Sequence, residues 1–327
     1  MKLVVYNLRD FDEKEYFDHF CAQYGYEYVG TAEAPNPDNY ELARGADAIN
    51  IIPTPMQKEQ IDAFHAMGVR YITTRAIGVD HIDVGYAHKL GMKVSNVTYS
   101  PESVANYAIM LMLIGCRKFM EIRERAQLQD YTLKGKMGKE ISNCTVGVIG
   151  AGRIGETLIR HLSGFGCRIL VYSRSERESV KQYAEYVSLE ELYAQSDIIT
   201  LHVPGHPALH HMIDAEAFAK MKDGVILINT ARGSLVDTGA LIANIENGKV
   251  GFAGMDTIEQ EMGLYYQNHI GDVIANHDLA ILRSFPNVVV SPHTAFYTDQ
   301  AISDQIRCTI ESLYAFEHGI PNPREIL

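Results

Sequence analysis

The stretch TVGVIGAGRIG, residues 145–155, decides the fold of this 327-residue chain. Its apolar start predicts a buried strand over 146–149, and a helix is expected over 154–165. Between them lies G-x-G-x-x-G, in which the first glycine permits a tight turn, the second lets backbone approach a pyrophosphate, and the third lets helix pack on strand. An ordinary tight turn is the alternative, but a second strand follows at the expected distance. The residues expected to bind a dinucleotide here are Gly150, Gly152, Arg153, Ile154 and Gly155.

The end of the next strand, expected over 168–172, bears on which dinucleotide is preferred. NAD-binding versions place an acidic residue about 20 positions after the glycine turn, where it accepts hydrogen bonds from the ribose. Ser173, Arg174 and Ser175 stand there instead. A guanidinium flanked by hydroxyls suits a 2′-phosphate. The sequence therefore predicts a preference for NADP(H), with NAD(H) as the second cofactor, unless Arg174 is an ordinary surface arginine.

Short β-rich runs alternate with helical stretches on both sides of this motif, which is typical of parallel sheets. A helix over 100–123, with Ser100 as cap and Pro101 at its start, is expected to connect two such series. A last amphipathic helix, 299–316, is expected to return to the first series. The expected strands are 3–6, 48–52, 71–73, 94–96, 146–149, 168–172, 198–202, 225–229 and 288–291, and the other helices are 12–24 and 57–67.

The predicted fold class is therefore α/β, with two Rossmann-like, doubly wound parallel-sheet domains. We expect the dinucleotide-binding domain, residues 100–296, to be inserted into a substrate domain formed by 1–99 and 297–327. The length of the chain suits two domains of ordinary size.

Composition excludes several classes of function. A formal charge of -12 disfavours nucleic acid, which binds through clustered Lys and Arg. The longest apolar run, 108–116, is far shorter than the roughly 20 residues that cross a bilayer, and no secretion signal is visible. Five cysteines without a C-x-x-C pair indicate reduced thiols in a cytoplasmic protein. His210, His211, His269 and His277 lack metal-ligand spacing, so no metal is expected.

Three further segments follow the glycine turn: Asn229–Gly233, Met255-Asp256 with Glu261, and Ser291–Ala295. In this order they resemble the D-isomer-specific 2-hydroxyacid dehydrogenase family. Arg75–Asp80 and Tyr99–Pro101 extend the resemblance over nearly the whole chain. Within the family the chain is similar to D-lactate and D-2-hydroxyisocaproate dehydrogenases, including the glycopeptide-resistance branch, which shares the run Tyr172–Ser175.

The resemblance implies three catalytic residues, and each suits its chemistry. Arg232 would grip the substrate carboxylate and polarise the carbonyl, because a planar guanidinium can bind bidentately. His293 would be the general acid and base, with Glu261 hydrogen-bonded to its imidazole. The alternatives are a turn histidine at a strand end and, for Glu261, a solvated charge run over 259–261.

The remaining contacts implied by the resemblance are less specific. Asp256 would meet the nicotinamide carboxamide, although a capping or structural aspartate is the alternative. Ile77 and Gly78 would offer backbone N–H groups to the substrate carboxylate, unless they form an ordinary tight loop. Tyr99 and Phe296 would line the substrate pocket, or else pack at a hinge. The other cofactor contacts expected are His202, Val203, Pro204, Thr230 and Ala231.

The function implied is reduction of pyruvate, or a related 2-oxo acid, to the D-2-hydroxy acid by a homodimer. The chain departs from several D-lactate dehydrogenases by placing Ile51 or Ile52 where they have an aromatic residue near the substrate. A D-2-hydroxyisocaproate or phenyllactate type of dehydrogenase with larger substrates is therefore the alternative. A second alternative is a non-catalytic, nucleotide-sensing protein like the family's corepressors.

Overall fold

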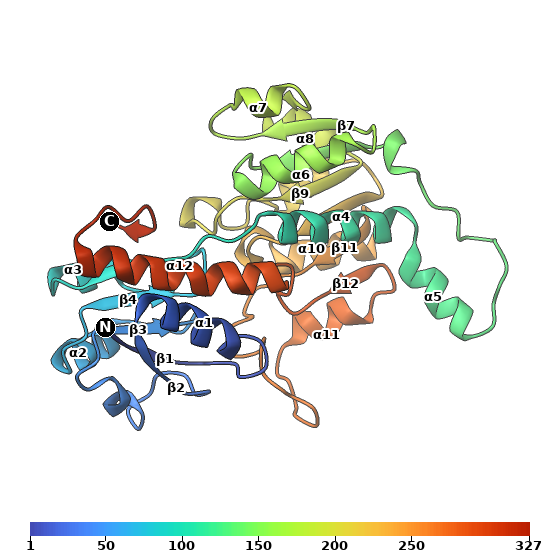
Figure 1. Cartoon of the computed structure of the whole chain (residues 1–327). Coiled ribbons are helices and arrows are strands. Elements are labelled where there is room, and N and C mark those ends of the chain that lie inside the picture. Colours follow the sequence, from blue (N-terminus) through green and yellow to red (C-terminus); the bar gives the residue numbers. More distant parts are fainter. The chain divides into compact units, whose positions relative to one another are not determined.

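The computed structural model describes residues 1–327, and these form two compact units, each with its own sheet (Figure 1). Unit 1 consists of Met1–Ser100 and Tyr297–Leu327, and unit 2 of Pro101–Phe296. Unit 1 is therefore discontinuous in sequence. The predicted fold class, two parallel-sheet α/β domains, is confirmed. No helix has the length and apolar character needed to span a bilayer.

Unit 1 contains a six-stranded sheet in the order β13-β5-β4-β3-β1-β2. Neighbouring strands are parallel except for β13, which runs antiparallel to β5. Its elements are β1 Lys2–Val5, α1 Lys14–Tyr24, β2 Glu27–Gly30, the 3₁₀ helix η1 Tyr40–Ala43, β3 Ala48–Ile51, α2 Lys58–Ala66, β4 Tyr71–Thr74, α3 Val84–Lys89, β5 Lys93–Ser95, α12 Asp299–His318 and β13 Glu325–Ile326.

The last helix, α12, completes the core of unit 1. It begins after Thr298, whose hydroxyl accepts a hydrogen bond from the N–H of Ala301 at 3.2 Å. Ile306, Ile310 and Leu313 recur on one face of α12 and are fully buried. This helix contacts α1 and β4, so the C-terminal segment belongs to the unit formed by the N-terminal one.

Unit 2 contains a seven-stranded parallel sheet in the order β12-β11-β10-β9-β6-β7-β8. Its elements are α4 Glu102–Cys116, α5 Phe119–Gln127, η2 Ile141–Asn143, β6 Thr145–Ile149, α6 Arg153–Ser163, β7 Arg168–Tyr172, α7 Glu178–Lys181, β8 Glu185–Tyr186, α8 Leu189–Gln195, β9 Ile198–Leu201, η3 Pro207–Leu209, α9 Ala215–Lys220, β10 Val225–Asn229, η4 Gly233–Leu235, α10 Thr238–Glu246, β11 Val250–Met255, α11 His277–Ser284 and β12 Val288–Val290.

Both faces of the unit 2 sheet are buried, because side chains alternate along its strands. Ile198 packs in one apolar cluster with α4 and α6, whereas Ile199 packs in a second cluster with α8, α9 and α10. Ile228 and Leu227 divide between the same two clusters. The carboxyl ends of β10, β11 and β12 come side by side, with Asn229 paired to Met255 and Met255 to Val290.

The expectation of a single connecting helix was wrong. The segment 100–123 forms two helices, α4 and α5, because Lys118 adopts a left-handed backbone conformation with φ of 49°. Pro101 occupies the N-cap position of α4, so this proline lies directly before the first residue of the helix. The N–H of Ser100 donates to the carboxylate of Asp304 at 3.0 Å.

Sequence analysis also missed strand β11, the neighbour of β10. Its residues include Gly251 and Gly254, and glycine weakens a strand prediction. Gly254 is needed for packing: a Cβ atom there would lie 2.9 Å from Ile228 Cδ1 and 3.1 Å from Leu111 Cβ. Close packing therefore explains why a glycine stands at position 254, although it weakens the prediction of strand β11.

Candidate functional site

The glycine turn after β6 depends on two close approaches of backbone. Gly150 has φ of 102°, and a Cβ there would lie 2.4 Å from the carbonyl oxygen of His202. A Cβ on Gly155 would lie 1.9 Å from the carbonyl oxygen of Gly150, so only glycine lets α6 start this close to the turn. By contrast, a Cβ on Gly152 would meet nothing within 4 Å. The turn is tight on two sides and open at Gly152.

This open space fits the pyrophosphate of a dinucleotide. Gly152 is the N-cap of α6 and provides no side-chain cap, so the first N–H groups of the helix are available to an anion. Thr230 directly follows β10, which is separated from β6 by β9 in the sheet, and its buried hydroxyl has no hydrogen-bond partner in the chain. An unsatisfied buried hydroxyl is costly, and a bound cofactor would satisfy it. Exposed Arg153 and half-buried Ile154 complete the turn.

The segment after β7 carries the guanidinium of Arg174, which makes no hydrogen bond or ion pair within the chain. Ser173 is half-buried, and Arg174 and Ser175 are exposed. The next two charged residues in the sequence have partners of their own: Glu176 pairs with Lys181 at 2.9 Å, and Arg177 pairs with Glu156 at 2.7 Å. Arg174 therefore stands without a carboxylate partner at the end of β7.

The segment after β9 lies against the glycine turn. The N–H of His202 donates to the carbonyl of Ile149 at 2.8 Å, and Val203 borders Gly150. The His202 ring Nε2 lies 2.9 Å from the hydroxyl of Thr200, and burial lowers the pKa of this imidazole to about 4. His202 is thus neutral near pH 7. Pro204 is exposed at the end of this segment.

The turn after β10 holds Arg232. Buried Asn229 shapes this turn: its side chain accepts from the N–H of Ala231 at 3.0 Å and donates to the carbonyl of Arg232 at 2.8 Å. Gly205 leaves room for the arginine, since a Cβ there would lie 2.9 Å from Arg232 Cγ. The next residue, Gly233, lies against the backbone of Ile258, so the turn packs beside the segment that carries Glu261.

Asp256, directly after β11, is fully buried. Its Oδ1 accepts from the hydroxyl of Ser291 at 2.6 Å and the N–H of Thr294 at 2.9 Å, and its Oδ2 accepts from the N–H of Ala295 at 2.9 Å. These hydrogen bonds are those expected of a structural aspartate, which was the alternative interpretation of Asp256. A contact between this carboxylate and the nicotinamide remains only a prediction.

His293 is held from several directions. Its φ is 53°, a left-handed conformation that costs on the order of 1–3 kcal/mol for a residue with a side chain. Its N–H lies 2.9 Å from the carbonyl oxygen of Asp256, and its Nδ1 lies 2.8 Å from Oε1 of Glu261. The ring Nε2 has no hydrogen-bond partner in the chain. Phe296 meets the imidazole edge to face, with centroids 6.3 Å apart.

The two glutamates of the acidic run 259–261 have different partners. Glu261 contacts His293, whereas Glu259 accepts from the hydroxyl of Thr238 at 2.6 Å and pairs with His211 at 2.7 Å. Burial raises the pKa of Glu259, but the hydrogen bonds from Thr238 and His211 outweigh it and leave the pKa lowered. Sequence spacing could not show this pairing, because it joins segments far apart in the chain.

His210, His211 and Glu259 are the group in the chain best able to hold a metal ion, since their ligand atoms lie within 4.8 Å of one another. Hydrogen bonding already accounts for the arrangement. Nε2 of His211 faces Glu259 at 2.7 Å and its Nδ1 lies 3.7 Å from Asp237.

Unit 1 contains the other predicted substrate contacts. The carbonyl of Ile77 accepts from the side chain of Asn96 at 2.7 Å, whereas the N–H groups of Ile77 and Gly78 make no hydrogen bond within the chain. Just before them, buried Arg75 pairs with Glu13 at 3.0 Å and fixes the start of the loop. Tyr99 is half-buried.

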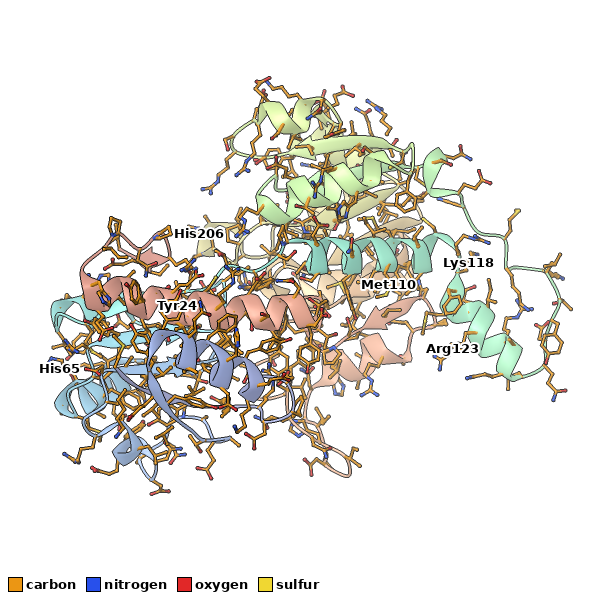
Figure 2. All side chains as sticks on the ribbon, in the orientation of Figure 1. Tyr24, His65, Met110, Lys118, Arg123 and His206 are labelled. Atoms are coloured by element: carbon orange, nitrogen blue, oxygen red, sulfur yellow. The ribbon has the colours of Figure 1, made fainter.

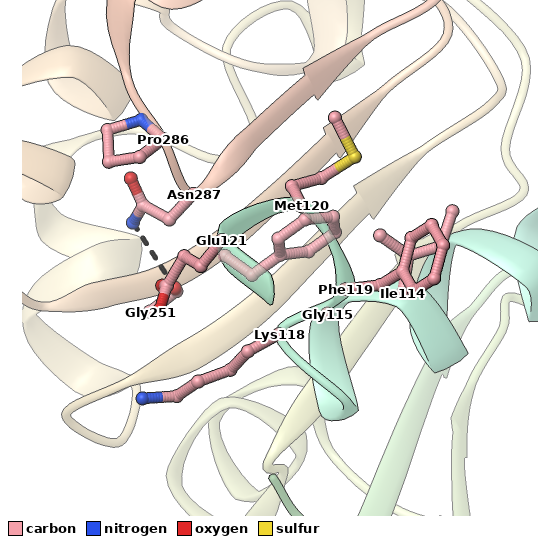
Figure 3. Close-up of a pocket in the computed structure, with 10 residues that line it drawn as sticks. Ile114, Gly115, Lys118, Phe119, Met120, Glu121, Gly251, Pro286 and Asn287 are labelled. Atoms are coloured by element: carbon pink, nitrogen blue, oxygen red, sulfur yellow. Dashed lines mark hydrogen bonds between the residues drawn. The ribbon is translucent and has the colours of Figure 1, made fainter. Parts of the chain in front are cut away.

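A hollow on unit 2 lies away from all these residues. Figure 3 shows it between the end of α4, the start of α5 and Asn287, whose side chain donates to the carbonyl of Gly251 at 3.2 Å. Ile114 and Phe119 line it, and none of the predicted site residues does. This hollow is therefore not the candidate active site.

The open glycine turn beside a parallel sheet, with a carboxylate-bound histidine at the ends of β10–β12, defines the class of nicotinamide-dependent dehydrogenases. The chain belongs to the D-isomer-specific 2-hydroxyacid dehydrogenase family: the model of that family's NAD binding domain matches residues 109–295. An aromatic 2-oxoacid reductase of Clostridium sporogenes is 40% identical over 320 residues, which cover 97% of this chain and 96% of that protein.

Solved structures agree with this membership. A D-lactate dehydrogenase from Treponema pallidum has a TM-score of 0.92 at 30% identity, covering 100% of both chains. A D-2-hydroxyisocaproate dehydrogenase has a TM-score of 0.90 at 34% identity, covering 100% of this chain and 99% of that one. The resemblance drawn from the sequence motifs is confirmed, and the chain is an oxidoreductase of this family.

We predict opposite effects of one added methyl group at two glycines of the turn. Gly155→Ala should lower the free energy of unfolding by about 1–3 kcal/mol, because the methyl group overlaps the Gly150 carbonyl. Gly152→Ala should leave stability nearly unchanged but weaken dinucleotide binding at least about tenfold, because it fills the open space. Denaturant unfolding and fluorescence titration with NADH and NADPH measure the two effects. Unchanged affinity in Gly152→Ala would show that the dinucleotide does not approach this glycine.

Proposed function

We propose that the protein reduces a 2-oxo acid to the D-2-hydroxy acid, with unit 2 binding the nicotinamide cofactor. The observation that supports this most directly is the His293 imidazole, which is hydrogen-bonded to Glu261 through Nδ1 and leaves Nε2 unpaired. A positioned imidazolium of this kind can donate a proton to a carbonyl oxygen. When bound, the reduced nicotinamide supplies the hydride for C2.

Each residue of the proposed mechanism has one task. The guanidinium of Arg232 binds the substrate carboxylate and stabilises negative charge that develops on the carbonyl oxygen. Nε2 of His293 donates the proton to that oxygen, and the Glu261 carboxylate orients the ring and stabilises its charged form. Backbone N–H groups of Ile77 and Gly78 bind the carboxylate, and Tyr99 and Phe296 contact the substrate side chain. Thr230, Ala231 and the 202–204 segment bind the cofactor.

Pyruvate is the first candidate substrate, and a larger 2-oxo acid is the second. The relative from Clostridium sporogenes is named as acting on aromatic 2-oxo acids. Of the two isoleucines considered, Ile51 is fully buried in the core of unit 1, whereas Ile52 is half-buried and is smaller than an aromatic residue. Because one methylene changes the preference by about 1–3 kcal/mol, a panel of 2-oxo acids compared by kcat/KM is needed to order them.

His293→Ala should lower kcat by about 10²–10⁴-fold, the range for losing a general acid, with cofactor affinity nearly unchanged. His293→Asn should show the same loss, and it serves as the matched variant because asparagine tolerates the left-handed backbone better than alanine. Steady-state rates and cofactor titration measure both quantities. Turnover close to wild type in both variants would remove His293 from the mechanism.

We also propose that NADPH is preferred over NADH. Support comes from Ser173, which replaces the usual acid, and from exposed Arg174, which has no partner in the chain. The family description names NAD, so this preference would be a departure within the family. A charge-assisted hydrogen bond to a 2′-phosphate contributes about 1.5–3 kcal/mol.

The wild-type kcat/KM should therefore be roughly tenfold to a hundredfold higher with NADPH than with NADH. Ser173→Asp should erase or reverse this ratio, because the carboxylate binds ribose hydroxyls and repels the phosphate. Arg177→Gln, which removes a nearby arginine already paired with Glu156, is the control at the same ionic strength. Equal or better use of NADH by the wild type would refute the preference.

We further propose that the protein is a homodimer, built through α5 and the segment that follows it. No residue of α5 is buried, and this segment extends away from the sheet of unit 2 (Figure 1). Figure 2 labels Lys118 and Arg123 on this part of the chain and Met110 on α4. Several exposed apolar side chains near one another in the chain are typical of a protein–protein interface. The exposed apolar residues of this region are Met110, Phe119, Leu128, Tyr131, Leu133 and Met137.

Sedimentation velocity should give the mass of two chains for the wild type and of one chain for Leu128→Asp/Leu133→Asp, because burying two carboxylates opposes association. Val273→Asp changes an equally exposed apolar residue outside this segment and should stay dimeric. A monomeric wild type, or a double variant that remains dimeric, would reject this interface.

A cytoplasmic location stays part of the proposal. All five cysteines are unpaired in the structure, as expected in a reducing compartment.

A further inference from the structure

Tyr266 makes a contact that sequence analysis did not anticipate. Its hydroxyl donates a hydrogen bond of 2.8 Å to the backbone carbonyl oxygen of His293, which lies 27 residues further along the chain. The side chain is nevertheless 57% exposed, so burial does not explain its position. Its ring centroid lies 6.1 Å from that of the His293 imidazole and 6.5 Å from that of Phe296.

This contact completes the restraints on His293. The N–H of His293 points to the carbonyl oxygens of Asp256 and Ser291, at 2.9 and 3.0 Å. Its carbonyl oxygen accepts from Tyr266, and its ring is fixed by Glu261. A left-handed residue persists only where its surroundings determine it fully, and here both adjoining peptide groups and the side chain have partners.

Glu261 and Tyr266 belong to one turn. The N–H groups of Leu264 and Tyr265 both donate to the carbonyl of Glu261, at 3.0 and 3.1 Å. The residue that holds the imidazole and the residue that holds the peptide are therefore connected by a few hydrogen-bonded residues. A shift of Tyr266 would change the angle between the His293 ring and the Glu261 carboxylate.

We propose that Tyr266 is a positioning residue for the reaction: its hydroxyl fixes the His293 peptide and thereby the direction in which Nε2 presents its proton. The inference rests on the proposed function, because it requires His293 to be the acid. Tyr266 itself need not touch substrate. The hydrogen bond to the carbonyl, and not the aromatic ring, is the part that acts.

Tyr266→Phe removes only the hydroxyl and should lower kcat by about 5–20-fold, since small misplacements of a reacting group cost up to about a hundredfold. KM for the 2-oxo acid and the cofactor dissociation constant should stay within about twofold. The adjacent Tyr265 provides the matched control, because its buried hydroxyl has no hydrogen-bond partner. Tyr265→Phe should turn over like the wild type. Equal rates in the two variants would overturn the proposal.

The pH dependence separates positioning from simple support of the fold. If the imidazole drifts from Glu261, the basic limb of the kcat/KM profile should move to lower pH in Tyr266→Phe, in the same direction as in Glu261→Gln. The double variant Tyr266→Phe/Glu261→Gln should lose less activity than the product of the losses in the two single variants, because both substitutions act through His293. A lowered melting temperature with an unmoved pH limb would mean that Tyr266 only stabilises the segment, and would reject positioning.

His293→Ala distinguishes the two levels of the argument. An inactive His293→Ala with a Tyr266→Phe that matches the wild type rejects the positioning role alone. An active His293→Ala rejects the proposed function and, with it, the role of Tyr266.

Discussion

The carboxylate of Asp256 has no contact with solvent and accepts three hydrogen bonds from Ser291, Thr294 and Ala295. A buried carboxyl group is costly unless its oxygens are hydrogen-bonded, so these three bonds restrict the shape of the loop. His293 lies in this loop, where it has a left-handed conformation and its ring contacts Glu261. The position of the proposed acid is therefore set by a group that need not touch the substrate.

The parallel sheet of unit 2 brings these parts together. Adjacent parallel strands end at the same edge, so the turns after β10, β11 and β12 become neighbours although they are distant in sequence. The glycine turn after β6 and the segment after β9 meet in the same way, through the approach of Gly150 to His202. Small residues permit these approaches, and buried polar residues such as Asn229 give each turn its shape.

The sequence was most informative where the physical constraint is local. The glycine spacing after an apolar strand fixes the dinucleotide turn, and β7 and β10 were predicted with their bounds. Glu261 could be separated from Glu259 only by the family's spacing, and the structure shows why they differ: one contacts His293 and the other His211. Strand β11 was not predicted because it contains two glycines, of which Gly254 allows the close approach of Leu111 from α4.

Other features depend on long-range contacts that no local pattern carries. The structural contacts of Asp256 require a loop about 35 residues away, and the bond from Tyr266 requires a backbone carbonyl that has no side-chain signature. The break between α4 and α5 comes at the left-handed Lys118, a residue type that ordinarily favours helix.

The discontinuity of unit 1 has a consequence during synthesis. A ribosome releases β1–β5 early, but α12, which covers β4 and α1, is made only after the whole of unit 2. Until then the apolar surface later covered by Ile306, Ile310 and Leu313 has no native partner. Unit 2 is continuous and can complete its core as soon as it has been synthesised. During that time unit 1 is incomplete, and its exposed apolar surface can bind chaperones or associate with other nascent chains. The order in which the chain emerges thus makes unit 1, and not unit 2, the part of the new protein that is more exposed to misfolding and aggregation.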